Sequence, residues 1–289
     1  RCGRGKRISR SVREQCGGDS AVLHARLPDS GRKKKILRRE ERIHNAQGGG
    51  RELKLDLGVG VNAEVCRGSG TPLLFLHGWG GSALSFGGAF DYFASRGRTC
   101  AALDFPPFGT SDPPPPDWSL GDYVRLTAAA ADALGLGRFI PIGHSFGGRV
   151  AIRLAAETDR AEKLVLVSAA GLKPRRGLLY RLRRLAFRRD KARGRDVTKY
   201  YSPDWLAMPE YLRGVFARIV GEDLTPCLDN LNCPTLIVWG RRDRETPPYM
   251  ARRLKRGIKR GKLVFLEGGH FAYAENHTAF ASALDSFLN

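Results

Sequence analysis

From residue 53 onward, short apolar runs alternate with stretches of helical character, and this alternation constrains the fold more than any other feature of the sequence. Residues 73–76, 99–103 and 235–239 form runs with little polar interruption. Such a run indicates a strand buried on both faces, and strands that alternate with helices form right-handed βαβ units. We therefore expect an α/β fold with a mostly parallel central sheet and helices on both faces.

Period-two patterns at residues 53–57 and 61–65 predict an antiparallel pair that opens the sheet. The remaining strands are expected at residues 73–76, 99–103, 139–142, 163–167, 235–239 and 262–266. Helices are expected at about 85–96, 119–134, 146–156, 211–220, 248–256 and 278–288. The alternation breaks for about 60 residues after residue 167. We interpret the break as a helical cap inserted between two strands, at about residues 172–230.

The net charge of +20 is concentrated in two segments. Residues 1–51 hold 15 basic and 5 acidic residues, and residues 173–199 hold 12 and 2; the rest of the chain holds 22 of each. Residues 1–51 show no sustained apolar periodicity, which predicts a disordered basic tail before one large α/β domain at residues 52–289. No aromatic residue interleaves these charges as a base-stacking surface would require, so no specific nucleic-acid partner is expected.

The sequence contains neither a long apolar run nor the apolar core of a secretory signal, so we expect a cytoplasmic protein. The six cysteines form no CxxC pair, which argues against a metal site.

The arginine-rich part of the cap carries Leu178, Leu179, Leu182, Leu185 and Phe187 near helical spacing. One apolar stripe of this helix is therefore expected to cover a pocket. The alternative is that the helix or the basic tail contacts an anionic membrane, and we disfavour it for both segments.

Gly143-His144-Ser145-Phe146-Gly147 places a G-x-S-x-G pattern between an expected strand and an expected helix. In this position the pattern is typical of a strained turn that exposes a nucleophilic serine, with glycines where the backbone bends and packs closely. A serine hydroxyl needs an adjacent base, and that base needs a group to orient it. The pattern therefore predicts Ser145 as a nucleophile if such partners lie nearby.

Two residues that follow later strands can supply these partners. Asp243 follows the strand at residues 235–239, and His270 follows the strand at residues 262–266. Both loops leave the carboxyl ends of strands, at the sheet edge where Ser145 is expected. Asp104, Asp223 and Asp229 are alternative acids; the first ends an earlier strand, and the other two precede the strand that Asp243 follows.

A tetrahedral intermediate also needs donors for its oxyanion. The backbone amide of Phe146, after the nucleophile, is one candidate, and the amide of Trp79 in the glycine-rich turn at residues 77–81 is the other. His77 begins this turn and is expected to hold the loop by hydrogen bonding. His144 is expected to point away from Ser145, and His277 lies near the start of the last helix.

Six stretches, HGWGG, LDFPPFGTSD, GHSFGGRVA, LVLVSAAG, WGRRDRETPP and EGGHFAYAEN, resemble successive landmarks of the α/β-hydrolase superfamily. They are similar to those of lidded bacterial carboxylesterases and C–C-bond hydrolases. The resemblance runs from about residue 53 to the last residue. It implies an α/β-hydrolase fold, a Ser145, Asp243 and His270 triad, the amides of Trp79 and Phe146 as oxyanion hole, and no cofactor.

The expected activity is hydrolysis of a small-molecule ester by a nucleophilic serine, through an acyl-enzyme intermediate. The alternatives are C–C-bond hydrolysis of a β-diketone-like ketone and a ligand-binding protein, non-catalytic or only slowly hydrolytic, that uses a hydrolase fold. Candidate pocket residues are His77, Phe108, Tyr201, Trp205, Phe216 and Phe271.

Overall fold

The computed structural model describes residues 50–289 apart from 176, 202–204 and 207. Most of the predicted basic tail, residues 1–49, lies outside the described residues. Within the described part of the chain, eight strands form one sheet in the order β1-β2-β4-β3-β5-β6-β7-β8. The strands are β1 (Arg51–Asp56), β2 (Gly60–Cys66), β3 (Ser69–Leu76), β4 (Arg98–Leu103), β5 (Ile140–His144), β6 (Leu164–Val167), β7 (Thr235–Gly240) and β8 (Gly261–Leu266).

The predicted antiparallel opening of the sheet is confirmed, since Leu53 pairs with Ala63 and β2 then pairs antiparallel with β4. All later pairs, from β3 with β4 to β7 with β8, are parallel. Side chains alternate between the two faces along each inner strand, as the period of two requires. On β7, Ile237 and Trp239 enter one core cluster, whereas Leu236 and Val238 enter the other. Both faces are apolar, which explains the uninterrupted runs in the sequence.

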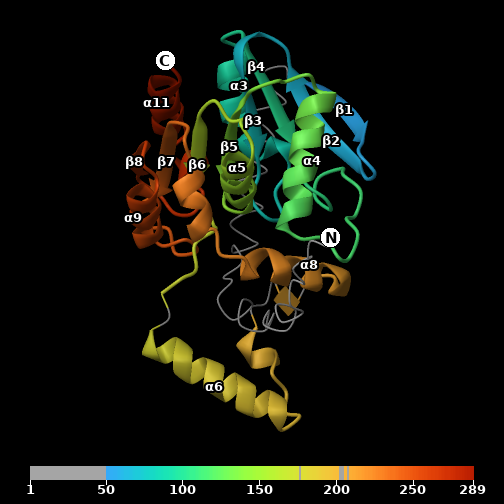
Figure 1. Cartoon of the computed structure of the whole chain (residues 1–289), viewed down its shortest axis with the longest axis vertical. Coiled ribbons are helices and arrows are strands. Elements are labelled where there is room, and N and C mark those ends of the chain that lie inside the picture. The colour runs from blue at the N-terminus through green and yellow to red at the C-terminus, as the bar shows by residue number, and fades with distance from the viewer. Residues whose placement is uncertain (1–49, 176, 202–204, 207) are drawn as a thin grey trace, which may run out of the picture.

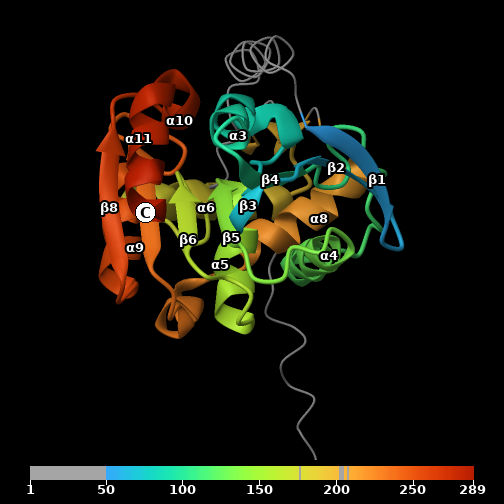
Figure 2. The same cartoon turned by 90° about the horizontal axis from the view of Figure 1, so that it is seen from above.

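Helices cover both faces, and Figure 2 shows the two layers on opposite sides of the sheet. One layer contains η1 (Ala83–Phe86), α3 (Gly87–Ala94), α10 (Ala272–Glu275) and α11 (His277–Leu288). The other contains α4 (Leu120–Ala133), α5 (Phe146–Glu157) and α9 (Pro248–Gly257). The helix expected at about residues 85–96 is thus divided into a 3₁₀ turn and a shorter α-helix. The short helix α10 was not predicted.

The segment between β6 and β7 contains α6 (Leu178–Ala192), η2 (Thr198–Tyr200), α8 (Glu210–Gly221) and η3 (Thr225–Asn230). Figure 1 shows α8 below the sheet and α6 beyond it, away from the rest of the molecule. The expectation that one apolar stripe of α6 is covered is wrong for Leu182 and Leu185, which are 53% and 62% exposed. Phe187 on another face of α6 is buried instead, against Tyr200 and Tyr201.

A search of the described helices finds none with the length and apolar character that crossing a membrane requires.

Candidate active site

Ser145 stands at the junction of β5 and α5 with a backbone φ of 50° and ψ of −108°. A positive φ is strained for a residue with a side chain, and such strain is common where a protein positions a functional group. The two flanking positions have room only for glycine. A Cβ at Gly147 would collide with the carbonyl oxygen of Leu76, and one at Gly143 would collide with that of Gly147. Ser145 is partly exposed, whereas residues 141–144 and 146–150 are buried.

Asp243 and His270 meet at the same edge of the sheet, in the loops after β7 and β8. Asp243 Oδ2 lies 3.0 Å from His270 Nδ1, and both side chains are almost fully buried. Gly240 lets the two loops pack closely, because a Cβ there would collide with the carbonyl oxygen of Gly269. The structure therefore brings together the acid and the histidine that the sequence pairs.

The loop after β7 fixes the Asp243 carboxylate from several directions. The backbone amides of Glu245 and Thr246 donate to Oδ1 at 2.9 and 3.0 Å, and Thr246 Oγ1 lies 2.8 Å from Oδ2. Burial alone would raise the pKa of Asp243, but the contacts with His270 and Thr246 outweigh it and hold this pKa below its ordinary value. Asp243 is thus an ionised carboxylate aimed at Nδ1.

The alternative acids have other partners. Asp104 accepts hydrogen bonds from the Asn62 side chain at 3.1 Å and from the Thr110 amide at 2.9 Å, and so ties loops together beyond β4. Asp223 accepts from the amide and hydroxyl of Thr225. Asp229 is exposed. Only Asp243 among these four has a described contact with His270.

Two histidines near Ser145 hold loops in place. The Phe105 amide donates to His77 Nε2 at 2.8 Å, and His77 Nδ1 lies 2.7 Å from the Gly78 carbonyl oxygen, so the hydrogen of the neutral ring belongs on Nδ1. His144 Nε2 lies 3.0 Å from the carbonyl oxygen of His270. The expectation that His77 holds its loop by hydrogen bonding agrees with these contacts.

The glycine-rich turn after β3 lies directly against the Ser145 turn. The amide of Gly147 donates to the carbonyl oxygen of His77 at 3.1 Å. A Cβ added at Gly78 would lie 3.3 Å from Ser145 Cβ. The Trp79 ring also packs edge-on against that of Phe146, with centroids 5.4 Å apart. The turn that carries Trp79 therefore lies against Ser145, and Phe146 directly follows Ser145 in the chain.

Five of the six candidate pocket residues belong to one connected series of ring contacts, and the sixth, Phe271, lies elsewhere. Trp79 contacts Phe108 and Phe216, with centroids 5.0 and 4.9 Å apart. The chain of rings continues from Phe216 to Trp205 and then to Tyr201, and His77 packs against Phe108. Phe271 instead packs against His144 and Tyr273 in the core cluster under α3 and α11.

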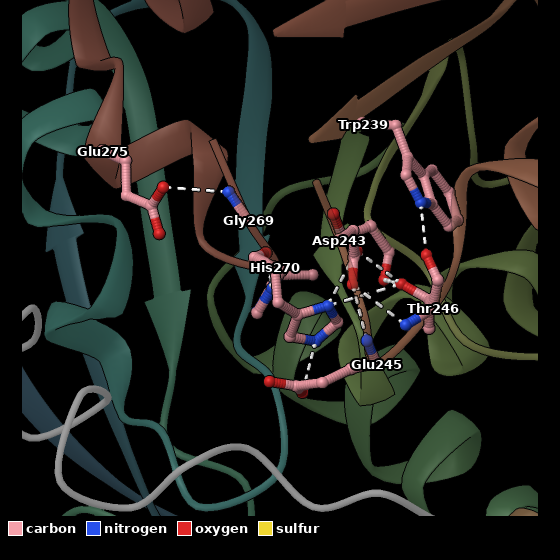
Figure 3. A network of polar contacts seen from close by, with 9 residues as sticks. Trp239, Asp243, Glu245, Thr246, Gly269, His270 and Glu275 are labelled. Carbon is pink, nitrogen blue, oxygen red and sulfur yellow. Dashed lines mark hydrogen bonds and ion pairs between the residues drawn. The ribbon is translucent and has the colours of Figure 1, made fainter. Parts of the chain in front are cut away.

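Glu245 was missed by the sequence analysis. Its Oε2 atom lies 3.2 Å from His270 Nε2, on the opposite side of the ring from Asp243, as Figure 3 shows. The signal that could have found it is the spacing, because Asp243 and Glu245 are two residues apart in one tight loop. Thr246 was missed as well, although a hydroxyl three residues after an acid in such a loop is well placed to bind it.

Within the described part of the chain, no three His, Cys, Asp or Glu side chains gather in an arrangement that could hold a metal ion.

The comparisons with known proteins agree with this architecture. The model of the alpha/beta hydrolase family matches residues 73–283, and the chain belongs to this family. It is 32% identical over 254 residues to AB hydrolase superfamily protein YisY of Bacillus subtilis, covering 77% of this chain and 93% of the relative.

Two further relatives have named substrates. Pimeloyl-[acyl-carrier protein] methyl ester esterase of Nitrosomonas europaea is 28% identical over 248 residues, covering 76% of this chain and 96% of the relative. The 2-hydroxy-6-oxo-6-phenylhexa-2,4-dienoate hydrolase of Comamonas testosteroni is 29% identical over 256 residues, covering 76% and 88%. Hydrolysis is thus the common theme of these relatives.

Proposed function

We propose that this hydrolase cleaves a small-molecule ester through an acyl-enzyme, with Ser145 as nucleophile, His270 as general base and Asp243 as the acid that orients the base. One observation carries the proposal: the buried contact of 3.0 Å between Asp243 and His270 lies at the sheet edge where Ser145 occupies a strained turn. A carboxylate on Nδ1 fixes the imidazole with Nε2 as its basic atom.

In the proposed reaction, Ser145 Oγ attacks the ester carbonyl while His270 Nε2 accepts the hydroxyl proton. The amides of Trp79 and Phe146 donate to the oxyanion, and this electrostatic contribution is commonly worth a few kcal/mol per donor. His270 then returns the proton to the leaving alcohol, and a water molecule releases the acyl group by the reverse sequence. The aromatic rings from Trp79 to Trp205 offer an apolar wall for the substrate.

Hydrolysis of p-nitrophenyl esters from acetate to decanoate tests the proposal. The wild-type protein should turn over at least one ester, and Ser145→Ala should lower kcat/KM by roughly a thousandfold or more, because the nucleophile is lost. Ser286→Ala, which removes an exposed hydroxyl on α11, is the matched control and should retain full activity. Equal rates for the wild type and Ser145→Ala would refute the assignment of the nucleophile.

A second candidate is C–C-bond hydrolysis of a ketone, which the similarity to the dienoate hydrolase favours. The same nucleophile and base would act on a ketone carbonyl, and the leaving group would be a carbanion that takes up a proton. A ketone substrate cleaved with no activity on any of the p-nitrophenyl esters would favour this candidate. Saturable binding without turnover of either class would favour the ligand-binding alternative.

A further inference from the structure

The imidazole of His270 lies between two carboxylates that come from a single loop. Asp243 Oδ2 is 3.0 Å from Nδ1, and Glu245 Oε2 is 3.2 Å from Nε2 (Figure 3). The His270 side chain is 3% exposed and that of Glu245 is 19% exposed. The geometry of Glu245 is set locally, since its own amide donates to Asp243 Oδ1 at 2.9 Å. The contact is thus held by the same turn that positions the acid of the triad.

A carboxylate oxygen 3.2 Å from Nε2 favours a proton on one of the two atoms. A neutral imidazole that donates Nδ1–H to Asp243 presents a lone pair at Nε2, and a carboxylate oxygen also presents only lone pairs. The two atoms attract one another only if Nε2 carries a hydrogen, as in an imidazolium, or if Glu245 is protonated. In both cases the substrate-free site holds one more proton than the form in which His270 can act as a base.

We propose that Glu245 is a positioning residue that retains a proton at His270 Nε2 in the substrate-free protein, and that it disfavours substrates with a carboxylate close to the scissile bond. The kinetic part of this inference rests on the proposed function. For Ser145 to transfer its hydroxyl proton to Nε2, the retained proton must first leave to solvent. Activity should therefore rise with pH as that proton is lost.

The other groups around His270 do not reproduce the effect of Glu245. Asp243 stabilises positive charge on the ring from the Nδ1 side and is part of the proposed triad. His144, from β5, contacts the His270 carbonyl oxygen through Nε2, with ring centroids 4.7 Å apart. Glu275, from α10, accepts the amide hydrogen of Gly269 at 2.9 Å. Thr246, 3.3 Å from Nδ1, is uncharged at any relevant pH.

The same carboxylate affects the choice of substrate. The acyl group bound to Ser145 and the leaving group that His270 protonates both lie close to Nε2 in the proposed reaction, and hence close to Glu245. A second negative charge there is repelled by Glu245, whose partial burial weakens the screening by water. Neutral or cationic acyl groups are therefore the favoured class. A compound such as the dienoate in the relative's name, which carries its own carboxylate, fits this site less well.

The first test measures the pKa of His270 in the substrate-free protein by NMR titration, with its signals assigned by their loss in His270→Asn. Glu245→Gln, which keeps the size and removes the charge, should lower this pKa by about one unit or more, because a neighbouring anion favours imidazolium. Glu267→Gln is the matched control, since this exposed carboxylate near the same loop pairs with Arg241 and not with His270. An unchanged or raised pKa in Glu245→Gln would overturn the inference, whether or not the protein hydrolyses esters.

The second test compares kcat/KM for p-nitrophenyl acetate and mono-p-nitrophenyl succinate across pH. In Glu245→Gln the rising limb of the profile should move to lower pH by the same shift seen in the titration, and the preference for acetate over succinate should fall by about tenfold. An unaltered limb and an unaltered ratio in an active enzyme would contradict the inference while leaving the assignment of Ser145 intact. Loss of that assignment would instead appear as Ser145→Ala retaining activity.

Discussion

The sheet with its two helical layers differs sharply from α6, although both carry regular apolar patterns. In β7 alternate side chains enter the two core clusters, so each has partners on its own face. In α6 the pattern also places leucines on one stripe, yet Leu182 and Leu185 face solvent while Phe187 is buried. The comparison teaches that periodicity identifies which residues share a face, whereas the neighbouring elements decide which face is covered.

The largest effect is expected from replacing a tryptophan in the sheet, compared with one in the segment between β6 and β7 that contains α6. Trp239 on β7 is fully buried, and its Nε1 donates to the Thr246 carbonyl oxygen at 2.7 Å. We expect Trp239→Ala to lower the free energy of unfolding by about 3–5 kcal/mol, as measured by urea denaturation. Trp205, in the small cluster with Phe216, is the control, and Trp205→Ala should cost clearly less. Equal costs would mean that the segment between β6 and β7 is as integral to the fold as the sheet.

A smaller effect is expected when the pH is lowered, because Asp190 on the buried face of α6 then becomes protonated. Asp190 accepts hydrogen bonds from Lys199 Nζ at 2.9 Å and Tyr200 Oη at 2.8 Å, and the contact with Lys199 is the main reason that its pKa falls from 3.8 to about 2. Because the folded-state pKa is depressed, this stabilisation is present above about pH 3.8 and is lost as the pH falls towards 2.

Hydrogen exchange checks this expectation. The protection of the α6 amides, corrected for intrinsic exchange rates, should fall between pH 4 and pH 2, and Asp190→Asn should remove that pH dependence. Constant protection of α6 in the wild type over this interval would show that the Asp190 contacts do not hold the helix.

The smallest effect is expected on the outer face of α6. Replacing both Leu182 and Leu185 with serine should change the free energy of unfolding by less than about 0.5 kcal/mol, because exposed side chains lose little on truncation. The control is Phe187→Ser, a replacement on the buried face of the same helix, and it should reduce the protection of α6 strongly. A large loss of stability in the double variant would show that the leucines are covered by another part of the chain.

The sequence was sufficient to predict the strands, the mostly parallel character of the sheet and the meeting of Asp243 with His270. Apolar runs report burial, and loops that leave the carboxyl ends of neighbouring parallel strands converge at one edge. The spacing places Glu245 two residues after Asp243 in the same loop, but which atom of the imidazole its side chain approaches depends on how the two loops pack against one another. The position of Phe271 could not be predicted either. It directly follows His270, yet the backbone directs its ring into the core cluster under α3.

The ends of the segment between β6 and β7 are held together at its base. The Leu224 amide donates to the Gly171 carbonyl oxygen at 2.9 Å, and Arg149 of α5 donates to the carbonyl oxygens of Ile219 and Glu222 at 2.9 and 3.0 Å. The two ends of the segment are thus fixed close together by these hydrogen bonds. The entropic cost of closing a loop between two such fixed ends grows only slowly with the length of the loop. Because both ends are fixed at one place, the intervening stretch can be shortened, lengthened or replaced while the sheet keeps the same fold.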